Sequence, residues 1–119
     1  MQQQRKLYIT PQEYLEIERQ AETKSEYIAG EIFAMAGASR THNLILTNTV
    51  ISVGTSLKGR GCDVYANDMR VEVDPIGLYT YPDVVIVCGQ PQFKDANEDT
   101  LLNPTVIMEV LSDSTASYD

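Results

Sequence analysis

The chain has 119 residues, 43% of them hydrophobic and 22% charged, which predicts one small soluble domain with a single core, residues 1–119. No apolar run approaches the roughly 18 residues of a membrane helix, and the first residues lack the apolar core of a signal peptide, so we expect a cytoplasmic protein without a membrane partner. A formal net charge of -8 argues against broad binding of a phosphate backbone, which normally requires a basic face.

A first helix is predicted to begin at Thr10-Pro11-Gln12-Glu13. Threonine can cap a helix, proline fits the first turn, and Glu13 occupies the position of the acid in a capping box. The apolar residues expected in the core are Tyr14, Leu15, Ile17 and Ala21. The acids expected to form a solvated face, rather than a site, are Glu13, Glu16, Glu18 and Glu22.

A β-hairpin is predicted for Lys24–Ile28 and Glu31–Met35, because Ala29-Gly30 between them provides a glycine for a tight turn. Glu31 opens the second of these strands. Acids on hairpins are more often exposed than functional, but Glu31 is also a possible additional site residue facing a cleft.

A second helix is predicted from a cap at Ser39 or Thr41 to about Leu57, where Lys58-Gly59 closes it. Its apolar residues recur at helical spacing and are expected to face a sheet. They are Leu46, Val50, Val53 and Leu57.

His42, the only histidine, lies in the first turn of this second helix. Two interpretations stay open: it orients a water or a substrate phosphate, or it is an ordinary surface histidine. Arg40 beside it carries a planar guanidinium that can contact a phosphate with two hydrogen bonds.

Two short strands are predicted at Cys62–Tyr65 and Met69–Val73, and an acidic irregular loop at Phe93–Leu102. Arg70 lies on the polar side of the second strand and is a second candidate for contacting substrate, if the few basic residues gather near a cleft. Cys62 and Cys88 lack CxxC spacing and a secretion signal, so we expect them to be reduced and buried.

Two apolar runs each carry one carboxylate: Asp83–Val87 after Pro82, and Pro104–Leu111 with Glu109 inside it. Their continuous Val, Ile, Leu and Met content is typical of central strands covered on both faces. If the two runs pair as an antiparallel hairpin, Val87 lies opposite Thr105 and Asp83 lies opposite Glu109.

Opposed carboxylates repel one another unless one is protonated or a cation lies between them. Hard oxygen ligands on rigid strands suit Mg²⁺ or Mn²⁺, and such ions retain waters that can attack a phosphodiester. In the alternative interpretation, Asp83 merely follows a turn proline and Glu109 emerges into solvent at a strand end.

The runs Tyr81–Cys88 and Leu102–Thr115 resemble the Uma-two family, also called domain of unknown function 820, whose members are restriction-endonuclease-like proteins. The resemblance covers essentially the whole chain. It also includes Tyr8–Leu15, Gly30–Gly37 and His42-Asn43.

This resemblance implies an α+β (α/β) fold with a restriction-endonuclease-like core, in which helices flank a central mixed sheet. It also implies a PD-(D/E)XK site in which Asp83 and Glu109 hold the metal and His42 assists. Leu111 stands where the pattern expects lysine, and Lys24 is a conceivable substitute. Family members continue past a segment like Ser112–Asp119 into a helix carrying a lysine, and then into further strands, so we expect the core of this chain to be C-terminally incomplete.

Two functions follow from the residues and the resemblance. The first is an endonuclease that uses Mg²⁺ or Mn²⁺ to hydrolyse nucleic acid, with DNA as the expected substrate; its catalytic residues are Asp83, Glu109 and His42, and Arg40 and Arg70 bind substrate. The second is a catalytically incomplete or truncated relative that acts as a binding or interaction module. An uncovered sheet edge would favour a homo-oligomer in either case.

Overall fold

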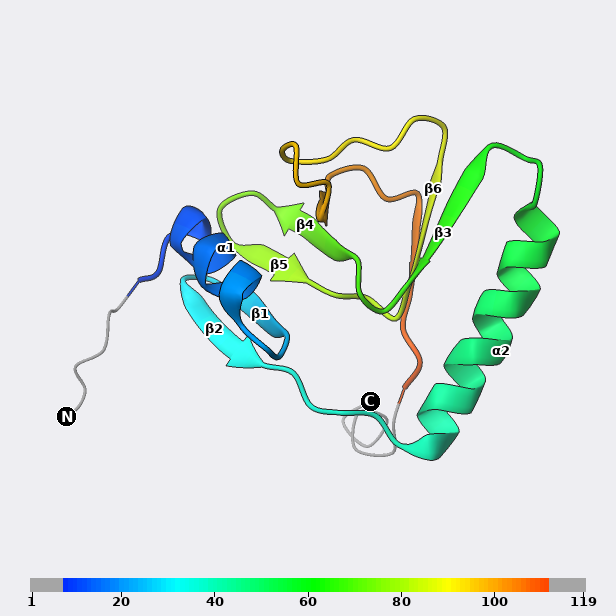
Figure 1. Ribbon diagram of the computed structural model, residues 1–119, viewed down its shortest axis with the longest axis horizontal. Coiled ribbons are helices and arrows are strands. Elements are labelled where there is room, and N and C mark those ends of the chain that lie inside the picture. Colours follow the sequence, from blue (N-terminus) through cyan, green and yellow to red (C-terminus); the bar gives the residue numbers. More distant parts are fainter. Residues whose placement is uncertain (1–7, 112–119) are drawn as a thin grey trace. The chain divides into compact units, whose positions relative to one another are not determined.

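The computed structural model describes residues 8–111 and shows an α+β fold with two helices and strands paired in both directions (Figure 1). The predicted fold class is confirmed. The chain divides into two compact units: Met1–Ala36 with Glu72–Thr80, and Gly37–Val71 with Tyr81–Asp119. The expectations for Ser112–Asp119 lie outside the described residues.

Helix α1 (Pro11–Gln20), in the first unit, begins as predicted. The Thr10 side chain accepts a hydrogen bond from the Glu13 N–H, and Glu13 accepts one from the Thr10 N–H, which completes the capping box. The buried face differs from the prediction, because Ile17 is 51% exposed, Ala21 is exposed beyond the helix end, and Glu18 is buried. The prediction that Glu18 lies on a solvated face is wrong: its carboxylate accepts the Ser25 N–H at 2.9 Å, and this bond compensates for its burial.

The predicted hairpin is confirmed as β1 (Ser25–Ile28) and β2 (Glu31–Ala34). Both turn residues, Ala29 and Gly30, have positive φ, the backbone that a two-residue hairpin loop needs. Strand β5 (Leu78–Thr80) pairs antiparallel with the other edge of β1. Helix α1 and strands β1 and β5 share a core of stacked and tilted aromatic rings. Its residues are Tyr14, Leu15, Tyr27 and Tyr79.

Helix α2 (Arg40–Leu57), in the second unit, begins after Ser39, whose hydroxyl accepts the His42 N–H at 3.1 Å. This confirms Ser39 as the cap. Leu46 is buried in one cluster with Val84 and Ile86, and the other residues of the predicted apolar stripe pack around it. These are Val50, Val53 and Leu57.

Three strands of the second unit form a sheet in the order β3 (Cys62–Ala66), β6 (Val84–Cys88) and β8 (Val106–Met108). The pairing Val84↔Met108 is the predicted antiparallel register of the two acid-bearing runs, and it is confirmed.

Strand β6 is central and covered on both faces, as predicted, because its side chains alternate between two clusters. The same prediction is wrong for β8, which lies at the edge of this sheet in the part of the chain described. Val106 and Ile107 are each 41% exposed.

Strand β4 (Arg70–Asp74) begins in the second unit and ends in the first. Its start pairs in parallel with β7 (Thr100–Leu101), through Arg70↔Thr100 and Val71↔Leu101. The prediction of an irregular loop to Leu102 is therefore wrong at its end. Thr100 and Leu101 are buried there, and Leu101 packs with Val71.

Cys62 and Cys88 form a disulfide and Cys88 is exposed, so the prediction that both are reduced and buried is wrong. The antiparallel register of β3 and β6 places the two residues directly opposite one another. This proximity comes from strand pairing across 26 residues, which the spacing of cysteines in the sequence does not reveal.

Between residues 8 and 111, neither helix combines the length and the apolar character that crossing a bilayer requires.

We expect Leu46→Ala to lower the free energy of unfolding by about 2 to 5 kcal/mol, because it leaves a cavity between α2 and β6. Ile51→Ala is the matched control: it lies on the same helix but is 60% exposed, so its effect should stay within about 1 kcal/mol. Urea denaturation measures both variants. Equal losses would show that the buried face of α2 is assigned wrongly.

We expect reduction of the Cys62–Cys88 disulfide to lower the free energy of unfolding by about 3 kcal/mol, because the bond closes a loop in the unfolded chain. Urea unfolding with and without a reductant measures the difference, and a Cys62→Ala/Cys88→Ala variant should not respond to the reductant. Full alkylation of both thiols in protein that has not been reduced would contradict the assignment.

Candidate active site

Asp83 lies directly before β6, after two buried residues, Tyr81 and Pro82. Proline cannot donate a hydrogen bond to a sheet, so its place just before the strand fits its chemistry. The Asp83 side chain is 17% exposed. The strand thus begins with a carboxylate near the surface whose backbone is anchored in the core.

His42 contacts Asp83 across 41 positions of sequence: its Nε2 lies 3.2 Å from Asp83 Oδ2. The Ser39 cap holds the first turn of α2 and so fixes the backbone that carries the imidazole. The His42 side chain is 13% exposed. Of the two interpretations of His42, the structure favours a defined contact with the acid over an isolated surface histidine.

The same Asp83 oxygen accepts the backbone N–H of Val110 at 2.7 Å. One carboxylate therefore joins the start of α2, the start of β6 and the segment after β8. Hydrogen bonds to an ionised acceptor are shorter and stronger than neutral ones, which makes Asp83 the connecting group of these three segments.

Glu109 is exposed and follows the last residue of β8. Continuing the register one residue beyond Val84↔Met108 aligns it with Asp83, as the sequence predicts. The prediction that both carboxylates lie inside buried strands is wrong, because each lies just outside a strand end. Their placement lowers the cost of burying two like charges.

Among residues 8–111, no group of three or more histidine, cysteine, aspartate or glutamate side chains could hold a metal ion. Two carboxylates remain, Asp83 and Glu109. Both are oxygen donors of the kind that Mg²⁺ prefers, and this ion is usually bound by one or two carboxylates and retains several waters.

The second ring nitrogen of His42, Nδ1, is buried and has no hydrogen-bond partner in the described part of the chain. Such atoms are rare in folded proteins and call for an explanation. When Nε2 donates to Asp83, Nδ1 presents a lone pair that can accept a hydrogen bond from a water or a ligand.

The other predicted site residues have different surroundings. Arg40 is exposed as the first residue of α2, two positions before His42. Glu31 is exposed at the start of β2, in the first unit. Arg70 is only 4% exposed and its guanidinium contacts protein groups, so this geometry does not support its predicted contact with substrate.

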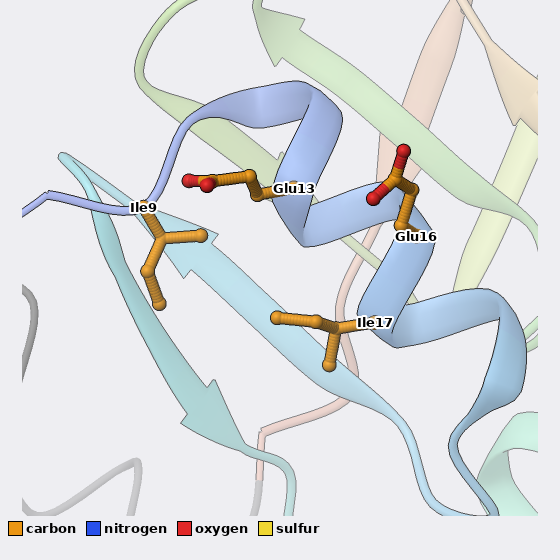
Figure 2. A pocket seen from close by; sticks show the side chains of 4 residues that line it. All are labelled: Ile9, Glu13, Glu16 and Ile17. Carbon is orange, nitrogen blue, oxygen red and sulfur yellow. The ribbon is translucent and has the colours of Figure 1, made fainter.

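A hollow of about 290 Å³ in the first unit lies beside α1 (Figure 2). Ile9 and Ile17 line it together with Glu13 and Glu16. Glu13 completes the helix cap, so its position has a structural reason. We assign no chemistry to this hollow.

Sequence reasoning missed one contributor to the site, the Val110 N–H, which becomes a neighbour of Asp83 only in the fold. No side-chain pattern could have revealed it, because the backbone of Val110 makes the contact.

The family model that matches residues 11–119 is Uma2, described as "Putative restriction endonuclease". Two curated relatives come from Synechocystis sp. (strain ATCC 27184 / PCC 6803 / Kazusa). The uncharacterized protein sll1609 is 39% identical over 111 residues, covering 93% of this chain and 63% of the relative. The uncharacterized protein slr1290 is 33% identical over 111 residues, covering 93% of this chain and 57% of the relative.

A crystal structure of "a putative nuclease belonging to DUF820" from Anabaena variabilis ATCC 29413 has a similar fold, with a TM-score of 0.72 at 21% identity. The match covers 92% of this chain and 64% of that one. The chain thus spans about 60% of the length of the relatives it matches.

We expect Asp83→Ala to accelerate hydrogen exchange of the Val110 amide by about tenfold or more, because hydrogen bonds to charged groups contribute roughly 1.5 to 3 kcal/mol. Asp74→Ala is the matched control: its carboxylate accepts the Ile76 N–H in the first unit. Exchange measured by NMR should change at Val110 in the first variant only. Unchanged Val110 exchange would refute the contact.

Proposed function

The chain belongs to the Uma2 family of restriction-endonuclease-like proteins, and from that premise we propose that it is an endonuclease that hydrolyses phosphodiester bonds, with DNA as substrate and Mg²⁺ or Mn²⁺ as cofactor. The observation that carries the proposal is the contact between Asp83, the acid of the Pro-Asp pair, and a histidine whose other ring nitrogen is buried and has no hydrogen-bond partner. A helix cap and a central strand hold this pair.

Asp83 and Glu109 would hold the cation, which when bound supplies Lewis-acid stabilisation of the charge on a phosphoryl oxygen. Asp83 would also have a second role, which does not depend on the cation. Its Oδ2 orients the His42 ring, so that Nδ1 keeps one direction for accepting a hydrogen bond.

His42 Nδ1 would accept a proton or hydrogen bond from the water that attacks phosphorus. This role requires the groups that cover Nδ1 to move aside when substrate binds, because the atom is buried in the structure. Arg40, exposed at the start of the same helix, would contact a phosphate of the substrate.

The alternative proposal is a binding or interaction module, and Leu111 favours it. This residue is 53% exposed and stands where the PD-(D/E)XK pattern expects lysine, so it provides no positive charge for the transition state. The exposed apolar residues Val106 and Ile107 on β8 would suit association with a second copy. The homo-oligomer stays a prediction.

We expect Mn²⁺ to bind the wild-type protein and to support cleavage of plasmid DNA. Asp83→Asn and Glu109→Gln should each weaken Mn²⁺ binding in calorimetry and lower the cleavage rate on the order of a hundredfold, because each removes an oxygen ligand or its charge. Asp95→Asn, in an exposed loop of the same unit, is the matched control.

The outcomes separate the two proposals. Mn²⁺ binding that needs both acids, without cleavage, would support the binding module. Cleavage that persists in both acid variants would mean that a contaminant or another site is responsible, and it would refute the proposed endonuclease site.

A further inference from the structure

Arg70 is a buried cation with three separate partners in the second unit. Its Nε donates to Thr100 Oγ1 at 2.9 Å, its Nη1 donates to the Tyr81 hydroxyl at 2.9 Å, and its Nη2 forms an ion pair with Asp99 Oδ1 at 2.9 Å. A guanidinium is planar and rigid, so contacts at all three nitrogens hold it in one orientation.

Tyr81 lies two residues before Asp83, and only Pro82 separates them. Tyr81 is 7% exposed and Pro82 is fully buried. Proline fixes its own φ and restricts the residue before it, so few backbone rotations remain free between Tyr81 and Asp83. The Tyr81 ring and the Asp83 carboxylate are therefore joined by a short backbone segment with few free rotations.

We propose that Arg70 is a positioning residue: it holds the Tyr81 hydroxyl, and through the rigid Tyr81-Pro82 step it sets the Asp83 carboxylate against His42 and Val110. The importance of this role for catalysis rests on the proposed function. The positioning of Asp83 against His42 and Val110 is a property of the protein without any ligand. The role replaces the contact with substrate that the sequence predicts for Arg70.

The charge of Arg70 supports this role. Burial lowers the pKa of the guanidinium, but Tyr81 and Asp99 outweigh burial, and the net pKa is raised above its ordinary value. The guanidinium carbon also lies 5.8 Å from the centre of the Tyr81 ring, where the ring attracts a cation. Arg70 thus stays charged and remains a donor to Tyr81 throughout the pH range of folded proteins.

Tyr81→Phe tests the proposal, because it keeps the ring and removes only the hydroxyl. The first readout is the Val110 amide in metal-free protein, since this N–H donates to Asp83 Oδ2. We expect a changed chemical shift and about tenfold faster hydrogen exchange. The second readout is Mn²⁺ affinity, which should fall about 10-fold to 100-fold, as is usual when a group that orients a metal ligand is lost.

Tyr79→Phe is the matched control, because it removes another buried hydroxyl, one that donates to Glu72 and Pro75 in the first unit. It should leave Val110 unchanged even if it lowers the melting temperature. A purely structural role for Arg70 would leave the Val110 chemical shift unaltered, and any faster exchange in Tyr81→Phe would then be shared by the other protected amides of the second unit.

Arg70→Lys provides a second variant, which keeps the positive charge and the Tyr81 hydroxyl but replaces the planar guanidinium group with an ammonium group. We expect the same change at Val110. A wild-type Val110 amide in Tyr81→Phe or in Arg70→Lys would overturn the proposal, as would a failure of both variants to fold. If the wild type binds no Mn²⁺ and Val110 still responds, the proposed function fails and the positioning role stands.

Discussion

The second unit depends on the burial of β6 on both of its faces. Val84 and Ile86 pack with Leu46 of α2, whereas Val85 and Val87 pack with Val71 and Leu101. A shift of the strand by one residue would exchange these two sets, so the register is fixed by packing on two sides at once. Asp83 precedes the first buried residue of β6, and the packing that fixes β6 therefore also fixes the start of the candidate site.

The helix caps and the register of the two acid-bearing runs could be predicted from the sequence because they depend on local chemistry. Thr10 and Ser39 cap helices through bonds that span three residues, and the proline-bounded runs around Asp83 and Glu109 allow one symmetrical register. These features need no knowledge of distant parts of the chain. The same reasoning aligned Asp83 with Glu109, but it placed both acids inside buried strands instead of just outside the strand ends.

The features that could not be predicted depend on contacts far apart in the sequence. Arginine is usually an exposed residue, so the sequence gives no sign that Arg70 is buried. Its burial depends on the parallel pairing of β4 with β7 and on the hydrogen bond to the Tyr81 hydroxyl. Glu18 likewise belongs to an acidic run, and only the Ser25 N–H explains its burial. Polar residues become core residues when a partner satisfies them, and the sequence does not show that partner.

The disulfide between Cys62 and Cys88 closes a covalent ring that contains all of β3, β4, β5 and β6. Asp83 and Arg70 lie within this ring, as does the exposed turn at Asp74–Gly77, where Ile76 is 79% exposed. Exposed turns are preferred sites for proteases. A single cut at this turn would open the ring without separating the chain into two fragments, so the protein would keep its mass on a non-reducing gel and would divide only after reduction.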